Sequence, residues 1–425
     1  MSGETKTPVL RFPDALPWEE KQLDKVVSFK KGKGYSKADL TESGTPVFLY
    51  GRMYTDYRFS VDGVDTFADL RSDSVLSTGA EVVVPASGET AEDIARATAI
   101  KASGIILGGD LNVLTPLVPE KTDTSVLALA LSNGTPSFEI ATRAQGGTIS
   151  HVHKDDLEDV LVSLPSSTSE QQSIGGFFRE LDALIAEREK ALGKLESLKK
   201  AMLEKMFPQG DAKVPEVRFK GFEGEWEEKK LGTSFGFGVQ NNTLSRSELS
   251  FAGTVRNIHY GDVLIKFGSV LDVSKDAVPF VADKSFKCTG KNRLVAGDIV
   301  MADTAEDEAV GKVTEIRGTE NAPAVSGLHT IVLRPLCKYA EGFLGYSLNA
   351  PAFHERLVSL MQGIKVLSIN KGTLAETVFL APAEPAEQQE IGSFFRSLDV
   401  LLAARREEAE KLKQLKKAFL ERMFA

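Results

Sequence analysis

The sequence predicts an α+β protein: two globular α/β-mixed domains separated by two long antiparallel coiled-coil helices, related by a pseudo-two-fold axis. Three observations predict this fold class. Residues 170–207 and 387–424 match at 23 of 38 positions at a constant offset of 217, without a gap. Short β-type runs and helical runs alternate irregularly in the regions between. The composition, with 42% hydrophobic and 26% charged residues, is that of an ordinary globular chain.

The duplication divides the chain into four parts. The segment PVLRFPDALPWEEKQL (8–23) resembles PEVRFKGFEGEWEEKKL (215–231), so the repeated unit is a globular region followed by a long helix. The residues between these matching ends differ strongly. We predict a first globular domain at 1–165, a first spacer helix at 166–208, a second globular domain at 209–384 and a second spacer helix at 385–425.

The globular regions contain short β-type runs bounded by glycine and proline, and longer runs of helical type. We predict strands within 79–88, 103–114, 261–268, 296–303 and 326–335. We predict helices within 89–102 and 339–361. Strands that cluster without regular βαβ alternation favour α+β domains.

Both copies of the duplicated segment are predicted to be helices, because their apolar residues recur at alternating steps of three and four. Pro165 and Pro208 bracket the first copy, and at ~1.5 Å per residue 38 residues span roughly 57 Å. One such helix could simply pack on its own domain, but two matched copies favour a helix pair. We predict that helix pairing and subunit docking use Ile174, Phe177, Phe178, Leu181, Leu184, Leu195, Leu198, Ile391, Phe394, Phe395, Leu398, Leu401, Leu412 and Leu415.

Each predicted helix has an arginine at a seam-type position, Arg188 and Arg405. Antiparallel pairing in register would bring the two like charges together, unless Glu187, Glu189 or Glu408 compensates them. The long arginine stems could equally turn away from the seam. Both interpretations remain open.

The order of the segments along the chain is nearly circular, because the start of the chain resembles the segment that follows the first helix. After the first helix, MFPQGDAKVPEVRF leads into the second globular region. The second helix stops at MFA, and the N-terminal KTPVLRF supplies what would come next. An antiparallel helix pair would therefore bring the end of the chain close to its start.

The formal net charge is −9, and it is unevenly spread. Residues 1–160 carry 16 Lys+Arg against 24 Asp+Glu, whereas residues 208–378 carry 20 against 21. This balance argues against a general DNA binder, because phosphate contacts need basic residues. Two cysteines give no disulfide framework, and no apolar run approaches the ~20 residues of a membrane span, so we expect a cytoplasmic protein.

The duplicated segment, with its shared EQQ, FFR, LKK and terminal MF, resembles the conserved region of the specificity (S) subunit of Type I restriction-modification systems. WEEKQL…GKGYSKADLTESGTPVFLYGRMY and WEEKKL…VQNNTLSRSEL…NIHYGDVLIKFGSVLDV resemble the openings of target-recognition domains in that family. The resemblance covers essentially the whole chain. It identifies the predicted globular domains as target-recognition domains 1 and 2, and the helices as the conserved spacers.

The resemblance implies a non-catalytic subunit that reads a bipartite, asymmetric site in double-stranded DNA, one half with each target-recognition domain. The helices would set the gap between the half-sites and dock two modification (methyltransferase) subunits. Those partners would carry adenine-N6 DNA methylation with S-adenosylmethionine. Restriction (nuclease and translocase) subunits would add ATP-dependent cleavage for host defence. No cofactor is then expected in this chain.

Candidate DNA-binding residues come from both globular regions. A basic loop in which glycines would let the backbone approach phosphate contains Lys30, Lys31, Lys33, Tyr35 and Lys37, and a mixed arginine and tyrosine cluster contains Arg52, Tyr54 and Arg58. In the second region the groups able to pair with base edges or phosphate are Asn241, Asn242, Ser245, Arg246, Arg256, Lys266, Lys284, Lys287, Lys291 and Arg293. A solvated loop and a tyrosine cluster at the edge of the core are the alternative interpretations.

No catalytic or metal site is predicted. The chain lacks a GxxxxGK[ST] nucleotide loop and the Asn/Asp-Pro-Pro-Tyr/Phe motif of amino-methyltransferases. His151 and His153 are taken as surface residues. A pure protein scaffold, which the acidic charge favours, stays open as an alternative to DNA recognition, whereas a single-chain restriction and methylation enzyme would need a longer chain.

Overall fold

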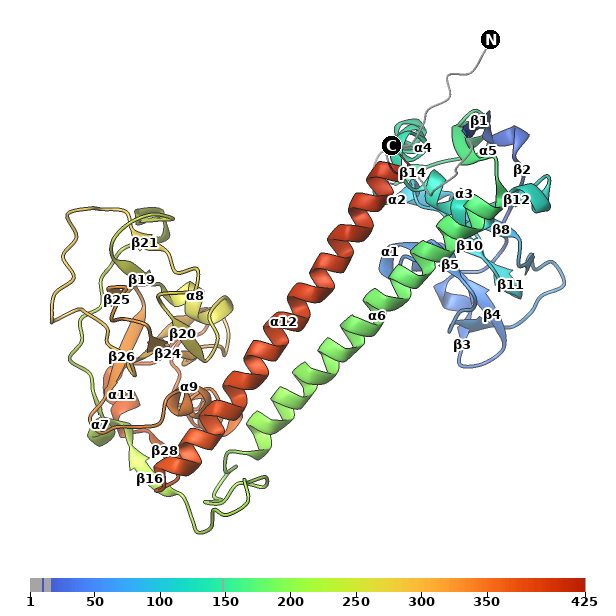
Figure 1. Cartoon of the computed structure of the whole chain (residues 1–425). Coiled ribbons are helices and arrows are strands. Elements are labelled where there is room, and N and C mark those ends of the chain that lie inside the picture. The colour runs from blue at the N-terminus through green and yellow to red at the C-terminus, as the bar shows by residue number, and fades with distance from the viewer. Residues whose placement is uncertain (1–9, 11–16, 147–148, 425) are drawn as a thin grey trace. The chain divides into compact units, whose positions relative to one another are not determined.

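The computed structural model describes residues 10, 17–146 and 149–424. The chain divides into two compact units, Met1–Glu189 with Glu407–Ala425 (unit 1) and Lys190–Arg406 (unit 2). Each unit contains one globular lobe together with part of each long helix (Figure 1).

The lobe of unit 1 contains two five-stranded mixed sheets. The first sheet has the order β2-β12-β8-β10-β5, and only its β10–β5 pair is parallel. The second has the order β3-β6-β4-β11-β7, with β11–β4 parallel. Their bounds are β2 (Val27–Lys31), β12 (Leu111–Pro116), β8 (Glu81–Pro85), β10 (Thr98–Ile100), β5 (Ser60–Val61), β3 (Leu40–Thr41), β6 (Phe67–Ala68), β4 (Thr45–Phe48), β11 (Ser103–Leu107) and β7 (Leu76–Thr78).

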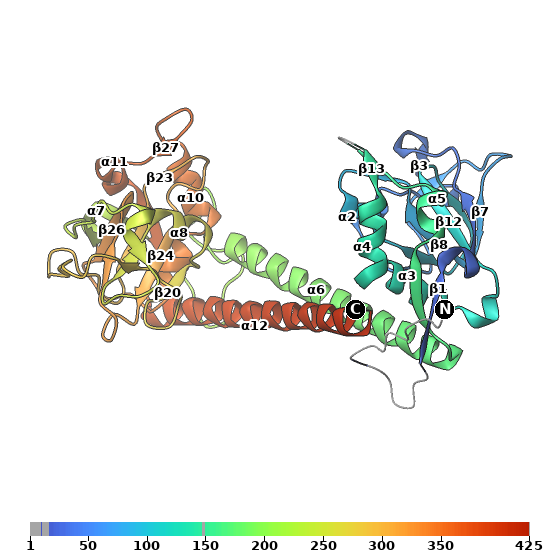
Figure 2. The same cartoon turned by 90° about the horizontal axis from the view of Figure 1, so that it is seen from above.

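Smaller elements complete this lobe. The strands are β1 (Trp18–Gln22) paired with β15 (Leu161–Pro165), and β13 (Gln145–Gly146), β14 (Ser150–His151) and β9 (Ser87–Gly88). The helices are η1 (Leu23–Lys25), η2 (Lys37–Asp39), α1 (Arg52–Thr55), α2 (Ala91–Ile94), η3 (Pro119–Lys121), α3 (Thr124–Leu131), α4 (Gly134–Arg143) and α5 (Lys154–Glu158). Every residue of α3 is buried, because this helix lies between α4 and strands β8, β10 and β15 (Figure 2).

Unit 2 repeats this plan. Its five-stranded sheet has the order β17-β26-β22-β24-β20, with β20–β24 parallel, as β5–β10 is in unit 1. The four-stranded sheet has the order β18-β21-β19-β25, and β16 pairs with β28 as β1 pairs with β15. Bounds are β16 (Glu227–Lys230), β17 (Phe235–Gly236), β18 (Leu249–Ser250), β19 (Arg256–Ile258), β20 (Val270–Asp272), β21 (Phe280–Val281), β22 (Ile299–Ala302), β23 (Thr304–Ala305), β24 (Val313–Arg317), β25 (Ala324–Ser326), β26 (Thr330–Pro335), β27 (Leu367–Ser368), β28 (Val378–Ala381), α7 (Leu231–Ser234), η4 (Arg246–Glu248), α8 (Tyr260–Ile265), α9 (Phe343–Ser347), α10 (Pro351–Val358) and α11 (Lys371–Glu376).

Two of the element predictions in the lobes are corrected. Residues 261–268, predicted as a strand, begin with helix α8, because His259 caps its N-terminus by accepting a hydrogen bond from Gly261 N at 3.2 Å. Residues 89–102, predicted as a helix, contain only the short α2 and then strand β10. Pairing with β8 on one side and β5 on the other holds that segment extended.

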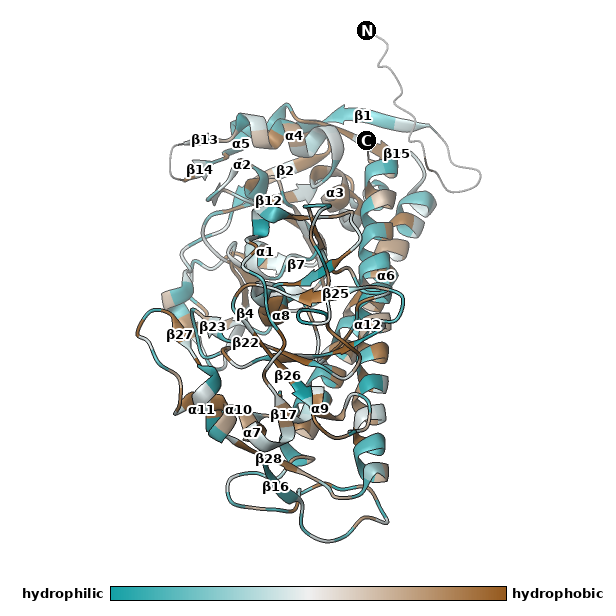
Figure 3. Ribbon diagram, turned by 90° about the vertical axis from the view of Figure 1, so that its left-hand side faces the viewer, coloured by the Kyte–Doolittle hydropathy of each residue, from teal (hydrophilic) through white to brown (hydrophobic). Residues whose placement is uncertain are grey.

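The two duplicated segments are continuous helices, as predicted: α6 (Thr168–Lys205) and α12 (Pro385–Met423). Hydrophobic and hydrophilic residues alternate along both (Figure 3). Proline suits the first position of α12, where no backbone N–H is needed for the helix.

The start of each long helix is fixed to its lobe by the duplicated EQQ residues. In unit 1, Trp18 Nε1 donates to Glu170 Oε1 at 3.2 Å, and Gln171 Nε2 donates to Pro165 O at 2.7 Å. In unit 2, Trp226 Nε1 donates to Glu387 at 3.4 Å, and Gln388 Nε2 donates to Pro382 O at 3.0 Å. These four positions recur in both units, because buried polar groups need such partners.

Within each unit, the segments of α6 and α12 run antiparallel. In unit 1, Asp182 pairs with Lys416 at 2.5 Å, and Arg188 Nε lies 3.1 Å from Glu408 Oε1. In unit 2, Glu196 pairs with Arg406 at 2.6 Å. Arg188 is thus compensated by one of the carboxylates proposed for that role.

Three of the residues predicted for helix pairing and subunit docking are exposed rather than buried between the helices. Leu198, Leu401 and Leu415 are 42%, 39% and 46% exposed, and Leu402 is buried instead of Leu401. A straight helix has 3.6 residues per turn, so a 3.5-residue pattern drifts off the contact face. The other predicted positions are buried or half-buried: Ile174, Phe177, Phe178, Leu181, Leu184, Leu195, Ile391, Phe394, Phe395, Leu398 and Leu412.

The predicted cyclic closure is confirmed in unit 1. Leu10 N donates to Arg422 O at 3.2 Å, and Phe424 lies 5.6 Å from Trp18, ring to ring. The equivalent contact in unit 2 joins Val217 N to Lys205 O at 2.9 Å. The end of the chain therefore enters the core of the lobe that begins it.

No helix among the described residues is both long and apolar enough to cross a membrane.

Candidate nucleic-acid interface

The basic loop of unit 1 follows the edge strand β2 and is held by backbone hydrogen bonds. Lys30 and Lys31 are both exposed, because β2 ends the sheet order. Lys33 N donates to Leu107 O at 3.1 Å. A Cβ at Gly32 would lie 1.9 Å from Gly108 O, so this glycine serves close packing of backbones. The loop is thus anchored through its backbone at Gly32 and Lys33, and its contact with phosphate stays a prediction.

Tyr35, predicted to contact DNA, is a core residue that is 5% exposed. Its hydroxyl donates to Asp69 O at 2.9 Å, and the Arg71 guanidinium lies 4.4 Å from its ring centroid. Arg71 Nη1 also donates to Gly34 O at 2.6 Å. Tyr35 supports the loop from inside, while Arg71, which sequence reasoning missed, brings a half-exposed cation to it.

A hydrogen bond to the Ser36 backbone and the pairing with Arg71 together lower the pKa of Asp39 below its ordinary value. The cations of this loop are therefore partly matched by carboxylates that stay ionised. Lys33, which lies 3.0 Å from Asp73, is matched in the same way, whereas Lys37 is exposed.

The cluster of Arg52, Tyr54 and Arg58 is only partly available to a ligand. Arg52 Nη2 lies 3.3 Å from Asp56, and its other amino group donates to Asp65. The Tyr54 hydroxyl donates to the Ser87 carbonyl, and burial raises its pKa. Arg58 also lies 3.4 Å from Asp56, but 60% of its side chain is exposed, so it is the more accessible of the two arginines.

In unit 2 several predicted contacts are used inside the protein. Asn242 Nδ2 donates to Asn257 Oδ1 at 2.7 Å and to Ser326 O at 2.9 Å. The Ser245 hydroxyl donates to Glu248, which accepts at 2.8 Å in the capping box of η4. Arg256 donates to Val278 O at 2.8 Å. We assign Asn242, Ser245 and Arg256 to the scaffold of the lobe.

The remaining predicted residues of unit 2 form a basic surface, which we name the second basic face. Ala282 N donates to Glu248 O at 3.0 Å, and Gln240 N donates to Lys291 O at 2.9 Å. These bonds place the segment 282–293 beside the segment 240–250. The exposed polar residues of this face are Asn241, Arg246, Lys284, Lys287, Lys291 and Arg293. Lys266, also exposed, donates to Ala277 O at 2.6 Å.

Phe251 is an exposed aromatic residue of this region that sequence reasoning missed. It follows β18, and its side chain is fully exposed. Phenylalanine between polar residues and a glycine, as in the run LSFAG, is the signal that could have found it. An exposed aromatic ring suits stacking on bases or insertion between them.

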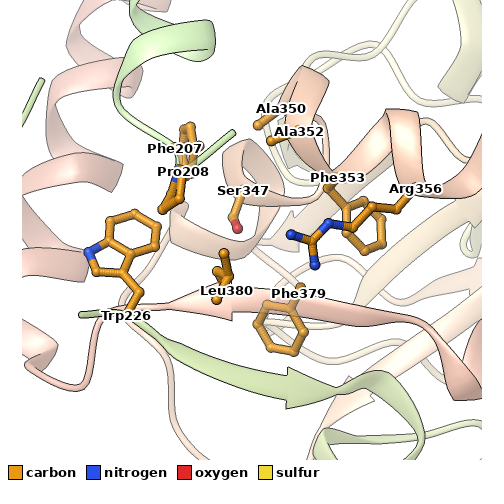
Figure 4. Close-up of a pocket in the computed structure, with 10 residues that line it drawn as sticks. All are labelled: Phe207, Pro208, Trp226, Ser347, Ala350, Ala352, Phe353, Arg356, Phe379 and Leu380. Carbon is orange, nitrogen blue, oxygen red and sulfur yellow. The ribbon is translucent and has the colours of Figure 1, made fainter. Parts of the chain in front are cut away.

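Two cavities of unit 2 do not resemble nucleotide sites. Phe207, Trp226, Phe379 and Arg356 surround a space of about 20 Å³ near the end of α6, which holds about one water molecule (Figure 4). An adjoining open cleft of about 470 Å³ is lined by cations and carboxylates together, namely Asp211, Lys213, Glu228, Glu355 and Arg356. Mixed charge of this kind gives no preference for a polyanion.

The described residues contain no group of three or more His, Cys, Asp or Glu side chains arranged to hold a metal ion. His151 and His153 are both exposed, with ring centroids 6.3 Å apart. Asp156 accepts a hydrogen bond from His153 N at 2.8 Å, so His153 is the N-cap residue of helix α5.

Comparison with known proteins agrees with this organisation. Residues 16–197 match the family model of the Type I restriction modification DNA specificity domain, and unit 2 repeats the sheet order of that region. This part of the chain therefore belongs to the family of Type I restriction modification DNA specificity domains. No curated protein sequence matches the chain.

Two solved structures share its fold over nearly their whole length. The S subunit of a Type I restriction-modification system from M. genitalium is 17% identical, with a TM-score of 0.58 over 99% of each chain. A chain from a study of complex assembly and conformational transition of the type I R-M system is also 17% identical. Its TM-score is 0.53, over 98% of this chain and 99% of that chain. At this identity the likeness establishes the fold.

Proposed function

We propose that this chain is a Type I specificity (S) subunit, which recognises a bipartite, asymmetric site in double-stranded DNA and docks methyltransferase subunits through its helices. One observation carries the proposal. The residues that fix each helix to its lobe are repeated between the units, whereas the exposed residues of the lobes are not. Repeated residues serve a common assembly role, and divergent surfaces serve two different ligands.

The divergence of the lobes supports an asymmetric site. The exposed candidates of the first lobe are basic and lie around strand β2 and helix α1, as Lys30, Lys31 and Arg58 do. The second basic face instead combines cations with an amide and a fully exposed phenylalanine. Different groups on base edges read different sequences.

The docking of partners is supported by two leucines at equivalent positions. Leu198 and Leu415 are related by the offset of 217, and both are exposed although they follow the seam pattern. Equivalent apolar positions suit two copies of one partner. We propose two modification subunits that bring adenine-N6 methylation with S-adenosylmethionine, and restriction subunits that use ATP. The chain itself would be non-catalytic.

The test exchanges residues 1–165 for the corresponding domain of another S subunit. The complex with the modification subunits is expressed in a strain without methylation of its own, and methylated sites are found by methylome sequencing. We expect a two-part motif in which the exchange alters one half only. A protein scaffold without DNA specificity would give no motif, and that result would overturn the proposal.

The spacer role is tested by inserting seven residues into both long helices. Seven helical residues add ~10.5 Å, or about three base pairs at 3.4 Å each. We therefore expect the gap between the half-sites to widen by about three base pairs. An unchanged gap would show that the helices do not set it.

A further inference from the structure

The second basic face contains a buried carboxylate beside an exposed arginine. Asp262, in the first turn of α8, is 1% exposed. Its Oδ1 lies 2.8 Å from Arg246 Nη1, and neither of its oxygens accepts a well-aligned hydrogen bond from the described residues. Burying a carboxylate is costly unless a cation lies beside it. Arg246 is therefore held against α8 although 62% of its side chain is exposed.

Both members of this pair stand on fixed backbone. Arg246 begins η4, whose capping box joins Ser245 N to Glu248 Oε2 at 2.9 Å. Asp262 follows the capping residue His259, which is 7% exposed. A guanidinium held in this way loses little conformational freedom when it binds a ligand.

The neighbourhood of Arg246 suits nucleic acid. Strand β18 follows η4 directly and pairs with β21, which leads into the exposed cations Lys284, Lys287 and Lys291. The nearby carboxylate of Asp283 accepts from the backbone and hydroxyl of Ser285 at 2.8 and 2.7 Å, so it is turned to its own loop. The lysines can attract the phosphate backbone around Arg246.

We propose that Arg246 reads a guanine in the half-site of the second lobe, and that Asp262 is its positioning residue. The Arg246–Asp262 pair carries no net charge, so it adds little attraction for phosphate. The N–H groups of Arg246 that face away from Asp262 keep the planar donor geometry that fits guanine O6 and N7. The inference rests on the proposed function, since it assigns a base to that interface.

The test applies methylome sequencing to the complex with the modification subunits, carrying Arg246→Lys or Asp262→Asn. Lysine keeps the charge but cannot make the two parallel bonds. We expect each variant to relax one guanine position by about 10-fold, in the half-site that is unaffected by exchange of residues 1–165. Lys275→Ala is the control, because Lys275 is exposed, pairs with Asp272 and should leave the motif unchanged.

A second measurement covers variants that accumulate poorly. The wild-type complex is titrated with duplexes in which 7-deazaguanine, which lacks the N7 acceptor, replaces guanine at each position of the motif. We expect one replacement in that half-site to weaken binding about 10-fold, and the same replacement to have little further effect on Arg246→Lys.

The outcomes separate this inference from the function on which it rests. If wild type yields no two-part motif, the proposed function fails. If the motif exists but Arg246→Lys leaves every position as selective as before, only the assignment of Arg246 fails. A uniform loss of methylation, with no relaxed position and no 7-deazaguanine effect, would make Arg246 a structural or phosphate-binding residue. Relaxation by Arg246→Lys but not by Asp262→Asn would overturn the role of Asp262.

Discussion

At the scale of single residues, a few buried polar groups fix each long helix to its globular lobe. Glu387 is almost fully buried and accepts from Arg218 Nε at 2.7 Å and Nη2 at 2.8 Å, as well as from Trp226. The hydrogen bond to Glu387 raises the pKa of Arg218. The first turn of α12 is therefore joined to the segment before β16 by a charge pair with little access to water.

We predict that Glu387→Gln lowers the free energy of unfolding by about 2–4 kcal/mol, because Arg218 would lose its countercharge in a buried site. Urea denaturation of the purified chain measures the change. Glu390→Gln, at an exposed position of the same helix, should stay within about 0.5 kcal/mol. Equal effects of the two substitutions would contradict a special role for the buried pair.

We expect His259 to make the second lobe less stable in acid. Burial lowers the pKa of His259 from its ordinary value of 6.5, and the cation Arg246 acts in the same direction, against Asp262. The unfolded chain therefore takes up a proton at a higher pH than the folded chain does. The stability contributed by the neutral imidazole is complete above pH 6.5 and is lost as the pH falls below it.

We predict that His259→Asn, which keeps a residue able to cap α8, flattens the loss of stability between pH 7 and pH 5. Thermal melting of both proteins across this pH range measures the difference. Parallel curves for the two proteins would show that another group causes the acid sensitivity.

At the scale of elements, α6 and α12 combine a packing face with residues left open. Phe177 and Phe419 meet at 5.1 Å between ring centroids in unit 1, and in unit 2 Phe395 of α12 lies 5.9 Å from Phe207, which follows the end of α6. Leu198 and Leu415 remain on the surface. The apolar surface that is not used within either unit is therefore available for partners.

We predict that Leu198→Asp and Leu415→Asp together weaken binding of the modification subunits at least about 10-fold, since burying one leucine contributes about 1.5–3 kcal/mol. Light scattering measures the mass of the complex, and each single variant should keep one partner. Ser197→Asp and Gln414→Asp are matched controls, because these neighbouring exposed positions are also related by the offset of 217. Normal assembly of the double leucine variant would exclude this docking surface.

The elements also show what the sequence can and cannot predict. Helices α6 and α12 were predictable because their pattern is local and occurs twice. Helix α8 was not predictable, because the segment GDVLIKFG is also typical of a strand and the helix depends on the cap that His259 provides. Asn242 looked like a base-reading group, yet its partner Ser326 lies 84 residues away and no local pattern reveals such a pair. The burial of Tyr35 was not predictable for the same reason, because its partner Asp69 lies 34 residues away.

At the scale of the whole molecule, unit 1 is assembled from both ends of the chain. Met423 and Phe424 belong to the same hydrophobic core as Trp18, and Leu10 is bonded to Arg422. In unit 2 the equivalent residues Met206 and Phe207 pack in the core that includes Trp226, and these three residues are close together in the sequence. The two cores therefore depend on these contacts more than on the order in which the segments are connected.

We predict that a circular permutant, joined from Ala425 to Met1 and opened between Gly210 and Asp211, folds and keeps the methylated motif of the wild type. Both residues at the new ends are exposed, and the helix ends keep their places in the two cores. Circular dichroism and methylome sequencing test it. Opening within α3 is the control, because that helix is wholly buried and should not tolerate new ends. Loss of folding in both permutants would contradict the prediction.

The paired tryptophan–glutamate contacts have a spectroscopic consequence. The chain has two tryptophans, Trp18 and Trp226, and each is buried where a long helix begins on its lobe. Each unit therefore carries its own intrinsic fluorophore at an equivalent joint. Replacing one tryptophan with phenylalanine leaves the fluorescence of the other tryptophan. The contact between helix and lobe can then be followed in each unit separately as partners or DNA bind.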